Sequence, residues 1–255
     1  MGPHTVGFRT AFATDYSRRY GAQTGRPIFV SSWYPARVLG DSSTLCYGDY
    51  LAVTAETEAY AAFAERLTAY NREATIQYGL EQGASLLAQR ELLPMRAFRN
   101  AEPVAGSFPV VVYHPGLGGS YEENSILCEY LASFGYIVVS STFQPEEASS
   151  LNLDWDLTRS FHDLGFLLNT MIPCWFAATG PLQHNDFTSQ GILDTIERHP
   201  DHTEATRIRQ RYNAICDLTH HFLDHTLKGQ PEPTCADEQL IALIHRPERQ
   251  VHSAA

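Results

Sequence analysis

Positive charge is scarce in this sequence of 255 residues. Its 18 Lys and Arg residues include a single lysine, Lys228, whereas Asp and Glu number 29 and bring the formal net charge to −11 at pH 7. The longest basic run is Arg18-Arg19. Such an acidic chain is repelled by a phosphate backbone and by an anionic lipid surface. We therefore expect neither nucleic acid nor a membrane surface as its partner.

Paired cysteines are also missing. The five cysteines are odd in number and never form a C-x-x-C pair: Cys46, Cys128, Cys174, Cys216 and Cys235. A disulfide framework and a thiolate zinc site both need closer or paired spacing. The pattern predicts reduced thiols that pack as small hydrophobes in a cytosolic protein, with no metal site.

Long apolar runs are absent as well. No stretch approaches the roughly 18 consecutive apolar residues of a membrane span, and the first 21 residues hold no run of signal-peptide length. Val6 stands where a myristoylation motif requires Ser or Thr. These observations predict a cytoplasmic protein without a membrane span.

The chain contains enough hydrophobic residues to form a core. Hydrophobic residues make up 44%, including 13 Tyr and 13 Phe, which argues against a disordered tail, a collagen or a coiled coil. We expect one α/β domain over residues 1–229 and a polar C-terminal tail over residues 230–255. Helices are predicted at 54–73, 84–93, 156–171 and 202–228 from their apolar spacing. A β-rich run predicts a strand at 27–34, placed at a sheet edge because of its prolines.

The most specific local pattern covers residues 108–141. An apolar strand (108–113) precedes the loop HPGLGGS (114–120), and Ser120 with Glu123 has the S-x-x-E spacing of a capping box for a helix that ends near Phe134. A second apolar strand follows at 136–141. The order strand, helix, strand predicts two adjacent parallel strands joined by a crossover helix.

The glycine-rich loop is the first candidate for chemistry. Glycines allow a sharp turn that exposes backbone N–H groups, and the following helix N-terminus adds partial positive charge, so the loop suits an oxyanion. The alternative is a tight turn whose glycines serve geometry alone. The dinucleotide pattern G-x-G-x-x-G is excluded, because Gly116, Gly118 and Gly119 are too close together.

The second candidate is His184, in the polar stretch QHNDFTS before the last long helix. A histidine in a polar loop is usually a surface residue. In an α/β-hydrolase, however, the catalytic histidine comes last in the order Ser, Asp or Glu, His. Together with the upstream HPGLGG loop, this position favours a triad histidine.

Four stretches carry a resemblance to a known family: RPIFVSSWYPAR (26–37), FPVVVYHPGLGGSYEENSILCEYLASFGYIVVSST (108–142), DLTRSFHDLGFLLNTM (156–171) and HNDFTSQG (184–191). With DYSRRY (15–20), they resemble the family of platelet-activating-factor acetylhydrolase and dienelactone hydrolase. The resemblance implies an α/β-hydrolase fold with a mainly parallel sheet and flanking helices. It also implies hydrolysis of a small carboxylic ester by a Ser-Asp-His triad without metal or cofactor. By position, Leu117 and Gly118 would offer the oxyanion-hole amides, and His184 would be the general base.

The nucleophile that this family requires is missing. No serine lies in a G-x-S-x-G elbow, since Ser133 falls within a predicted helix, Ser120 precedes one and Ser189 follows the histidine. His184 follows Met171 by only 13 positions. The elbow strand, the acid-bearing strand and their helices would take on the order of 100 residues. The sequence therefore predicts an incomplete α/β-hydrolase that lacks its central segment.

Other residues are poor replacements. Cys174 is the thiol nearest the junction, but no basic residue flanks it to activate it. Asp154 and Asp156 could orient His184, although two carboxylates at a helix start are more simply capping residues. His221 and His225 are four residues apart, yet they lie on the polar side of their helix without a third ligand.

These features lead to two hypotheses. The first is a carboxylic-ester hydrolase by descent, catalytically impaired because it lacks a nucleophile. The second is a non-catalytic pseudo-hydrolase that binds or oligomerises, or the product of a deletion or of an incorrectly assembled gene. The substrate and the oligomeric state stay open at this point.

Overall fold

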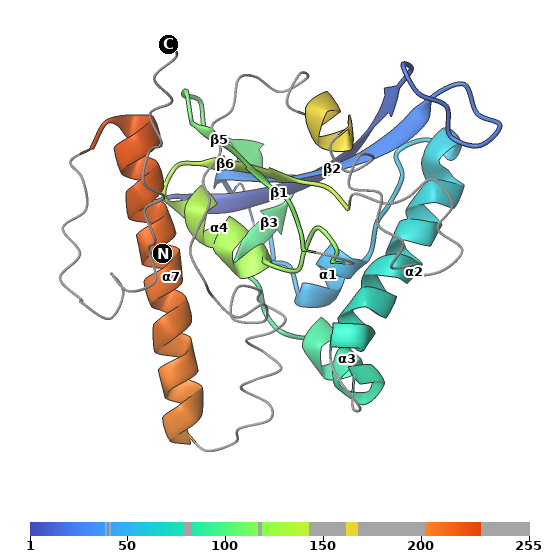
Figure 1. Ribbon diagram of the computed structural model, residues 1–255. Helices are drawn as coiled ribbons and strands as arrows, with labels where there is room; N and C mark the ends of the chain where they lie inside the picture. Colours follow the sequence, from blue (N-terminus) through green and yellow to red (C-terminus); the bar gives the residue numbers. More distant parts are fainter. Residues whose placement is uncertain are drawn as a thin grey trace, which may run out of the picture.

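The computed structural model describes residues 1–38, 40, 42–78, 83–116, 119–142, 162–167 and 202–230. Within them lies one six-stranded sheet with the order β3-β1-β2-β6-β5, and a short strand, β4, pairs with β2 away from this path. Helices α1 and α4 lie on one side of the sheet, and the short helical segment 162–167 lies on the other (Figure 1). The protein thus has a mixed sheet with flanking helices, which agrees with the predicted α/β class.

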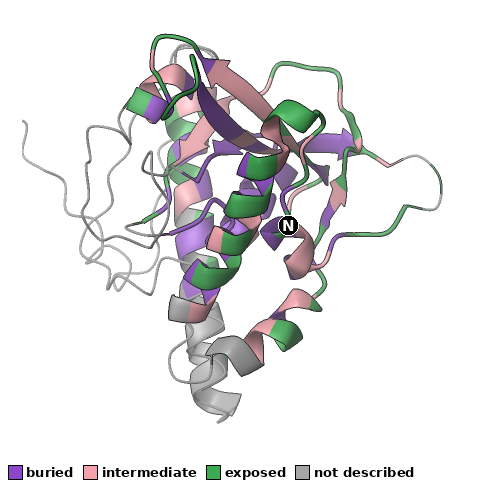
Figure 2. Ribbon diagram, turned by 90° about the vertical axis from the view of Figure 1, so that its right-hand side faces the viewer, coloured by how far each residue is buried: buried purple, intermediate pink, exposed green. Residues whose placement is uncertain are grey.

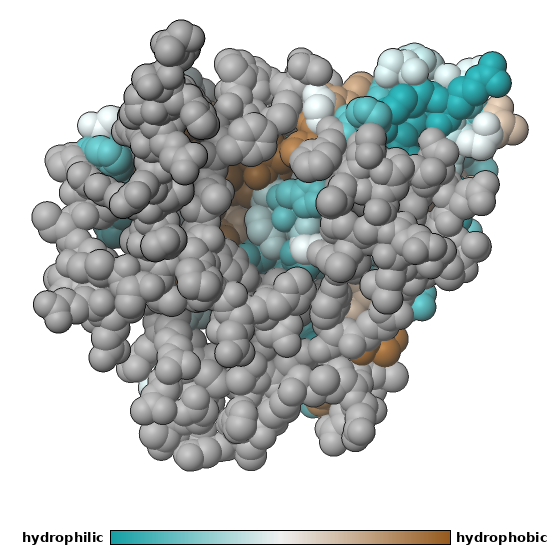
Figure 3. All heavy atoms as spheres, in the orientation of Figure 1, coloured by the Kyte–Doolittle hydropathy of each residue, from teal (hydrophilic) through white to brown (hydrophobic). Residues whose placement is uncertain are grey.

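A long hairpin forms the middle of the sheet. Strands β1 (Thr5–Asp15) and β2 (Arg26–Arg37) pair antiparallel over their whole length, from Thr5 opposite Ala36 to Asp15 opposite Arg26. The outer end of this hairpin carries hydrophilic residues on the surface (Figure 3). The prediction assigned no strand to residues 5–15, so β1 was missed.

The predicted edge position of the second strand is wrong, because β2 lies between β1 and β6. Residues 31–33 of β2 pair with β6, and both prolines lie outside this stretch. The Pro35 carbonyl accepts a hydrogen bond from Val104 N–H at 2.9 Å, just after β4. The N–H that Pro35 lacks would point to this same side of β2, away from β1. An interior strand tolerates prolines where its neighbour does not reach.

The predicted pair of parallel strands is confirmed. Strand β5 (Val110–Tyr113) pairs parallel with β6 (Ile137–Ser140), and helix α4 (Ser125–Ser133) connects them. The sheet as described is nevertheless mixed rather than mainly parallel. The strand β3 (Ala97–Arg99) runs parallel to β1, whereas β2 is antiparallel to β1, to β6 and to β4 (Glu102–Pro103).

Two helices, α2 and α3, lie between the hairpin and β3 in the chain, after the short helix α1. Helix α2 (Ala61–Tyr78) follows a 3₁₀ turn at Glu58–Tyr60, and helix α3 (Gly83–Glu91) lies close to the predicted 84–93. Figure 2 shows α2 from outside, with exposed residues along its outer face and buried ones behind. The helix begins later than predicted because the Thr68 hydroxyl accepts a hydrogen bond from Val53 N–H at 2.9 Å, which keeps that segment extended along α2.

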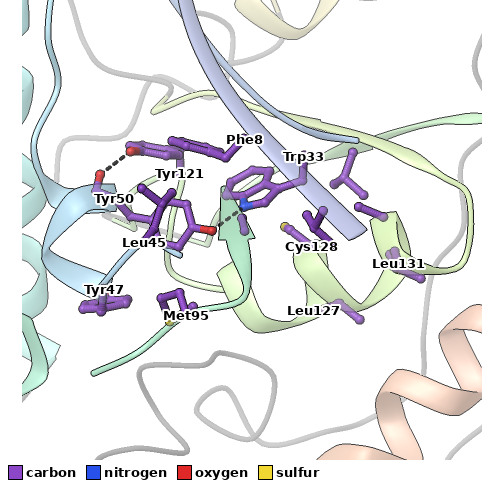
Figure 4. Close-up of a cluster of buried hydrophobic side chains, with 14 of the residues drawn as sticks. Phe8, Trp33, Leu45, Tyr47, Tyr50, Met95, Tyr121, Leu127, Cys128 and Leu131 are labelled. Carbon is purple, nitrogen blue, oxygen red and sulfur yellow. Dashed lines mark hydrogen bonds between the residues drawn. The ribbon is translucent and has the colours of Figure 1, made fainter. Parts of the chain in front are cut away.

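The core lies between the sheet and helices α1 (Tyr47–Leu51) and α4, and it is rich in aromatic rings (Figure 4). Phe8 meets Tyr50 edge to face with ring centroids 4.6 Å apart, and Trp33 Nε1 donates to the Tyr50 hydroxyl at 3.2 Å. That hydroxyl donates in turn to Glu129 on α4 at 2.6 Å. Glu129 also accepts from the backbone of Arg96 and Ala97, so one buried carboxylate links α1, α4 and β3. Burial raises the pKa of Glu129, although these hydrogen bonds act in the opposite direction.

Helix α7 (His202–Lys228) matches the predicted 202–228 and packs beside α4. It contributes Tyr212, Cys216 and Leu223 to the hydrophobic core. It also makes polar contacts, since the hydroxyls of Tyr130 and Tyr136 donate to Asp217 and Asp224. The single lysine, Lys228, donates to the Phe134 carbonyl and pairs with Asp224, each at 2.9 Å. Its ammonium nitrogen also lies 3.9 Å from the centroid of the Tyr136 ring. One ammonium group therefore holds the end of this helix against α4 and β6.

The described cysteines agree with the prediction of unpaired thiols. Cys128 and Cys216 are buried and Cys46 is partly buried, each as a free thiol. Burial raises the pKa of Cys128 and raises that of Cys216 to about 12, so both are inert small hydrophobes. Cys174 and Cys235, with residues 231–255 of the predicted tail, lie outside the described residues.

Candidate functional site

The candidate site lies at the carboxyl edge of β5 and β6. Because Tyr113 pairs with Ser140, both strands end at the same level of the sheet. The loop after β5 and the residues after β6 meet there, and Tyr121 N–H donates to the Thr142 hydroxyl at 3.1 Å. In open α/β sheets, ligands bind at this edge of the strands. The glycine-rich loop therefore begins at the carboxyl end of β5, as predicted from the sequence.

The Glu123 side chain lies against the described residues of this loop. The Glu123 carboxylate accepts hydrogen bonds from Gly116 N–H at 2.7 Å and from the Tyr113 hydroxyl at 2.6 Å. Gly119 N–H donates to the Gly116 carbonyl at 3.0 Å and closes the turn. A Cβ atom at Gly119 would come within 2.0 Å of Glu123 Oε2, so glycine is needed for the carboxylate to fit. Both of these loop amides are thus engaged inside the chain.

The predicted capping box is wrong. Helix α4 begins at Ser125 after Asn124, five residues beyond Ser120. The Ser120 hydroxyl donates to Glu122, whereas Glu123 turns back to the loop. Both side chains that a capping box would use thus have other partners, Ser120 within the turn and Glu123 in the glycine-rich loop. The Asn124 side chain accepts a hydrogen bond from the Tyr212 hydroxyl of α7.

Glu122 is the second acidic residue of this turn and is fully buried. One of its oxygens accepts from Ser120, and the other, Oε2, has no hydrogen-bond partner among the described residues. Burial raises the pKa of Glu122 to about 8; the Ser120 hydrogen bond lowers it, and the neighbouring charge of Glu123 raises it. At neutral pH Glu122 is therefore mostly protonated.

A cluster of charges anchors the helical segment 162–167 at the same edge. Residues 26–30 of β2 run beyond Ser31, which pairs with Ser140 at the end of β6, so Arg26 lies past the carboxyl ends of the parallel strands. Asp163 accepts two hydrogen bonds from Arg26, each at 2.8 Å, and one from Arg18 at 2.7 Å. Arg18 also pairs with Asp15 at 2.7 Å. Burial alone would raise the pKa of Asp15, but hydrogen bonds from Ser17 and Arg18 lower it.

The residues assigned to catalysis by resemblance are not described by the structure. Leu117, Gly118 and His184 lie outside the described residues, as do Asp154 and Asp156, so their proximity stays a prediction. His221 and His225 are described and exposed, which confirms their expected surface position. Among the described residues, no group of three His, Cys, Asp or Glu side chains could hold a metal ion. The described helices also include none that is long and apolar enough to cross a membrane.

The roles of Glu122, Glu123 and Asp163 were not predicted from the sequence. The S-x-x-E spacing suggested helix capping for Glu123, and nothing in the linear sequence links Asp163 to Arg26. A usable signal was the pair of glutamates soon after a glycine-rich loop, since two adjacent acids that become buried need separate partners.

Comparisons with known proteins give little further detail. No family model matches the chain, and no curated protein matches it. Nine chains among the solved structures match, including a ferulic acid esterase from Streptomyces cinnamoneus that is 22% identical. The match covers 55% of this chain and 33% of the esterase chain, with a TM-score of 0.34. The chain therefore spans about a third of the length of that esterase.

Proposed function

We propose that this chain derives from a carboxylic-ester hydrolase and does not turn over esters in its present form. The supporting observation is the segment from β5 to β6: a parallel pair of strands, joined through a glycine-rich loop and a helix, carries the HPGLGG motif of the resembled family. His184 would be the remaining triad member, and the amides of Leu117 and Gly118 would be what is left of the oxyanion hole.

The lack of turnover rests on the missing nucleophile. The sequence holds no G-x-S-x-G elbow, and two of the serines considered above are buried side chains with other partners. Ser120 donates to Glu122, and Ser133 donates to the Tyr130 carbonyl at 2.6 Å from within α4. Removing the nucleophile from a triad costs about 10⁶ in kcat. The second oxyanion-hole amide normally follows the nucleophile and is lost with it.

A non-catalytic binding role is the second candidate. It is supported by the Glu123 carboxylate, which accepts a hydrogen bond from the Gly116 amide and so engages one amide of the glycine-rich loop within the chain itself. Transcript sequencing across codons 171–183 would test whether the short connection belongs to the natural protein or reflects a deletion or an assembly error.

The test of the proposal is turnover of nitrophenyl acetate by the purified chain, together with labelling by an organophosphonate serine probe. We expect a rate indistinguishable from that of a heat-denatured control and no stoichiometric adduct. Peptide mapping after labelling covers every serine, and the Cys174→Ala variant serves as the matched control for a thiol nucleophile. Stoichiometric labelling with turnover would refute the proposal and identify an unrecognised nucleophile.

A further inference from the structure

The two outer strands of the described sheet differ in what lies beside them. At one end, the segment around Leu45 covers β3, because Leu45 N–H donates to the Ala97 carbonyl at 2.9 Å and the Leu45 carbonyl accepts from Met95 N–H at 2.8 Å. At the other end, β5 pairs with β6 alone among the described strands. All four residues of β5 are partly exposed, whereas Val139 of β6 is fully buried. Natural proteins usually cover such an edge or guard it with charge.

The backbone of β5 presents a defined set of groups at this open edge. Ile137 N–H of β6 donates to the Pro109 carbonyl at 2.8 Å, so Pro109 faces β6. The N–H and C=O groups of one residue in a strand point to the same side, and successive residues alternate. Val111 therefore also faces β6, whereas Val110 and Val112 direct their N–H and C=O groups to the open edge. Within the described part of the chain these two donors and two acceptors have no partner.

The side chains along this edge carry no charge. Asp, Glu, Lys and Arg are all missing from residues 103–121, a stretch centred on β5, although the chain has 18 basic and 29 acidic residues. Val111 and Tyr113 pack against the core, so Val110 and Val112 lie on the other face of the strand. With a net charge of −11, two copies of the chain repel one another wherever acidic surfaces meet. At β5 a second copy can approach without burying a charge.

We propose that β5 is a self-association edge, at which two copies of this chain pair their β5 strands antiparallel about a two-fold axis. The register follows from the groups at the edge. With Val111 on the axis, Val110 of each copy lies opposite Val112 of the other, and the two residues exchange two hydrogen bonds. All four donors and all four acceptors of the two edges are then satisfied. Three cross-strand pairs of valines result, and β-branched side chains pack well against such neighbours.

Symmetry favours a second copy as the occupant of this edge. A two-fold axis brings the same strand of both copies together, so one strand must satisfy itself. The strand does so in the register centred on Val111. An axis one residue away, at Val110 or Val112, would leave half of the edge groups unpaired within β5. The proposal does not depend on whether the protein hydrolyses esters.

Sedimentation of the full chain measures the association. A strand edge is a small interface and binds weakly, so the mean mass should rise from one chain toward two between about 10 μM and 1 mM. Salt screens the repulsion between two acidic chains, so the association should strengthen severalfold from about 0.05 to 0.5 M salt.

A pair of lysine variants separates the edge from general electrostatics. Val112→Lys places a charge at the edge and should weaken the association about tenfold, although it lowers the net negative charge of the chain. Ala69→Lys makes the same change in net charge on the exposed face of α2, and it should not weaken the association.

A disulfide tests the register directly. In the proposed pair the Cα atoms of the two Val111 residues are about 4.5 Å apart, as in a non-hydrogen-bonded antiparallel pair, and a disulfide can bridge this distance. Mild oxidation of Val111→Cys should therefore link residue 111 of one copy to residue 111 of the other, as identified by non-reducing peptide mapping. Val112→Cys is the matched control and should give no 112–112 bond, because residue 112 lies opposite residue 110.

Three results would each overturn the proposal: a wild-type chain that stays monomeric over the whole range at high salt, a dimer that Val112→Lys does not weaken, or a 112–112 bond in place of the 111–111 bond. If one of the variants fails to fold by circular dichroism, the others give the decision. For a monomer, hydrogen exchange of the β5 peptide identifies the alternative. Protected amides would mean that another segment of the same chain covers the edge, and rapid exchange would leave the edge to a different protein; both refute pairing with a second copy.

Discussion

Replacing Asp163 by asparagine should be among the most damaging single-atom changes to this protein. Asp163 is 3% exposed and accepts three hydrogen bonds from two arginines, of which Arg26 is equally buried. The cluster of Asp15, Arg18, Arg26 and Asp163 contains two charges of each sign. The substitution leaves one positive charge uncompensated and turns an amide N–H₂ toward a guanidinium donor, where a carboxylate oxygen accepted before.

The expected cost is about 3–5 kcal/mol in the free energy of unfolding, which is typical of breaking a buried ion pair by removing one partner. With a urea m-value of about 2–3 kcal/mol per molar, the unfolding midpoint should fall by about 1–2 M. Urea titration monitored by circular dichroism measures this shift. The helical segment 162–167 should also lose protection in hydrogen exchange, because Asp163 bonds it to the sheet.

The matched control is Glu91→Gln, which breaks the ion pair between Arg72 and Glu91 at 3.2 Å. The side chains of that pair are 48% and 29% exposed, so its loss should cost less than about 1 kcal/mol. If Asp163→Asn were no more destabilising than Glu91→Gln, the cluster would contribute little to folding and the reasoning from burial would be refuted.

Two further substitutions test the loop and the core. Gly119→Ala should destabilise the protein by about 1–3 kcal/mol in urea titration, because its Cβ would meet the Glu123 carboxylate; a neutral effect would show that the loop can shift freely. Tyr50→Phe should cost about 2–4 kcal/mol by the same assay, because Trp33 loses its acceptor and Glu129 loses a donor, and a cost under 1 kcal/mol would argue against this network.

Local sequence patterns predicted the elements whose signals lie within one segment. The strand at 110–113, the helix that follows it and the long helix 202–228 were all readable from apolar spacing. The β1 strand was missed although Val6, Phe8 and Phe12 stand at the even spacing of a strand with one buried face. Its stability comes from pairing with β2 along its whole length, which is information from another segment.

The prolines of β2 misled the prediction for a related reason. A proline disrupts pairing only on the side of a strand toward which its missing N–H would point. It does so only where a neighbouring strand extends along that side. Strand β6 pairs only with residues 31–33, so Pro27 and Pro35 are compatible with an interior strand. The length of a neighbour cannot be read from the strand itself.

At the candidate site, the sequence located the loop but not the groups that hold it. The HPGLGG motif correctly predicted a tight connection at the carboxyl end of β5. The roles of Glu122 and Glu123 depend on Tyr113 and on loop amides that approach only in the folded chain. Adjacent residues of one type can have different partners in the folded chain, and the linear sequence does not distinguish them.

The contacts of Lys228 make this protein unusually simple to follow by amine chemistry. An acylating reagent has a single lysine side chain to modify in the chain, besides the terminal amine. That ammonium group must leave Phe134, Asp224 and the Tyr136 ring before it can react as a free amine. The rate of its acylation therefore reports how often the end of α7 separates from α4 and β6, without any engineered label.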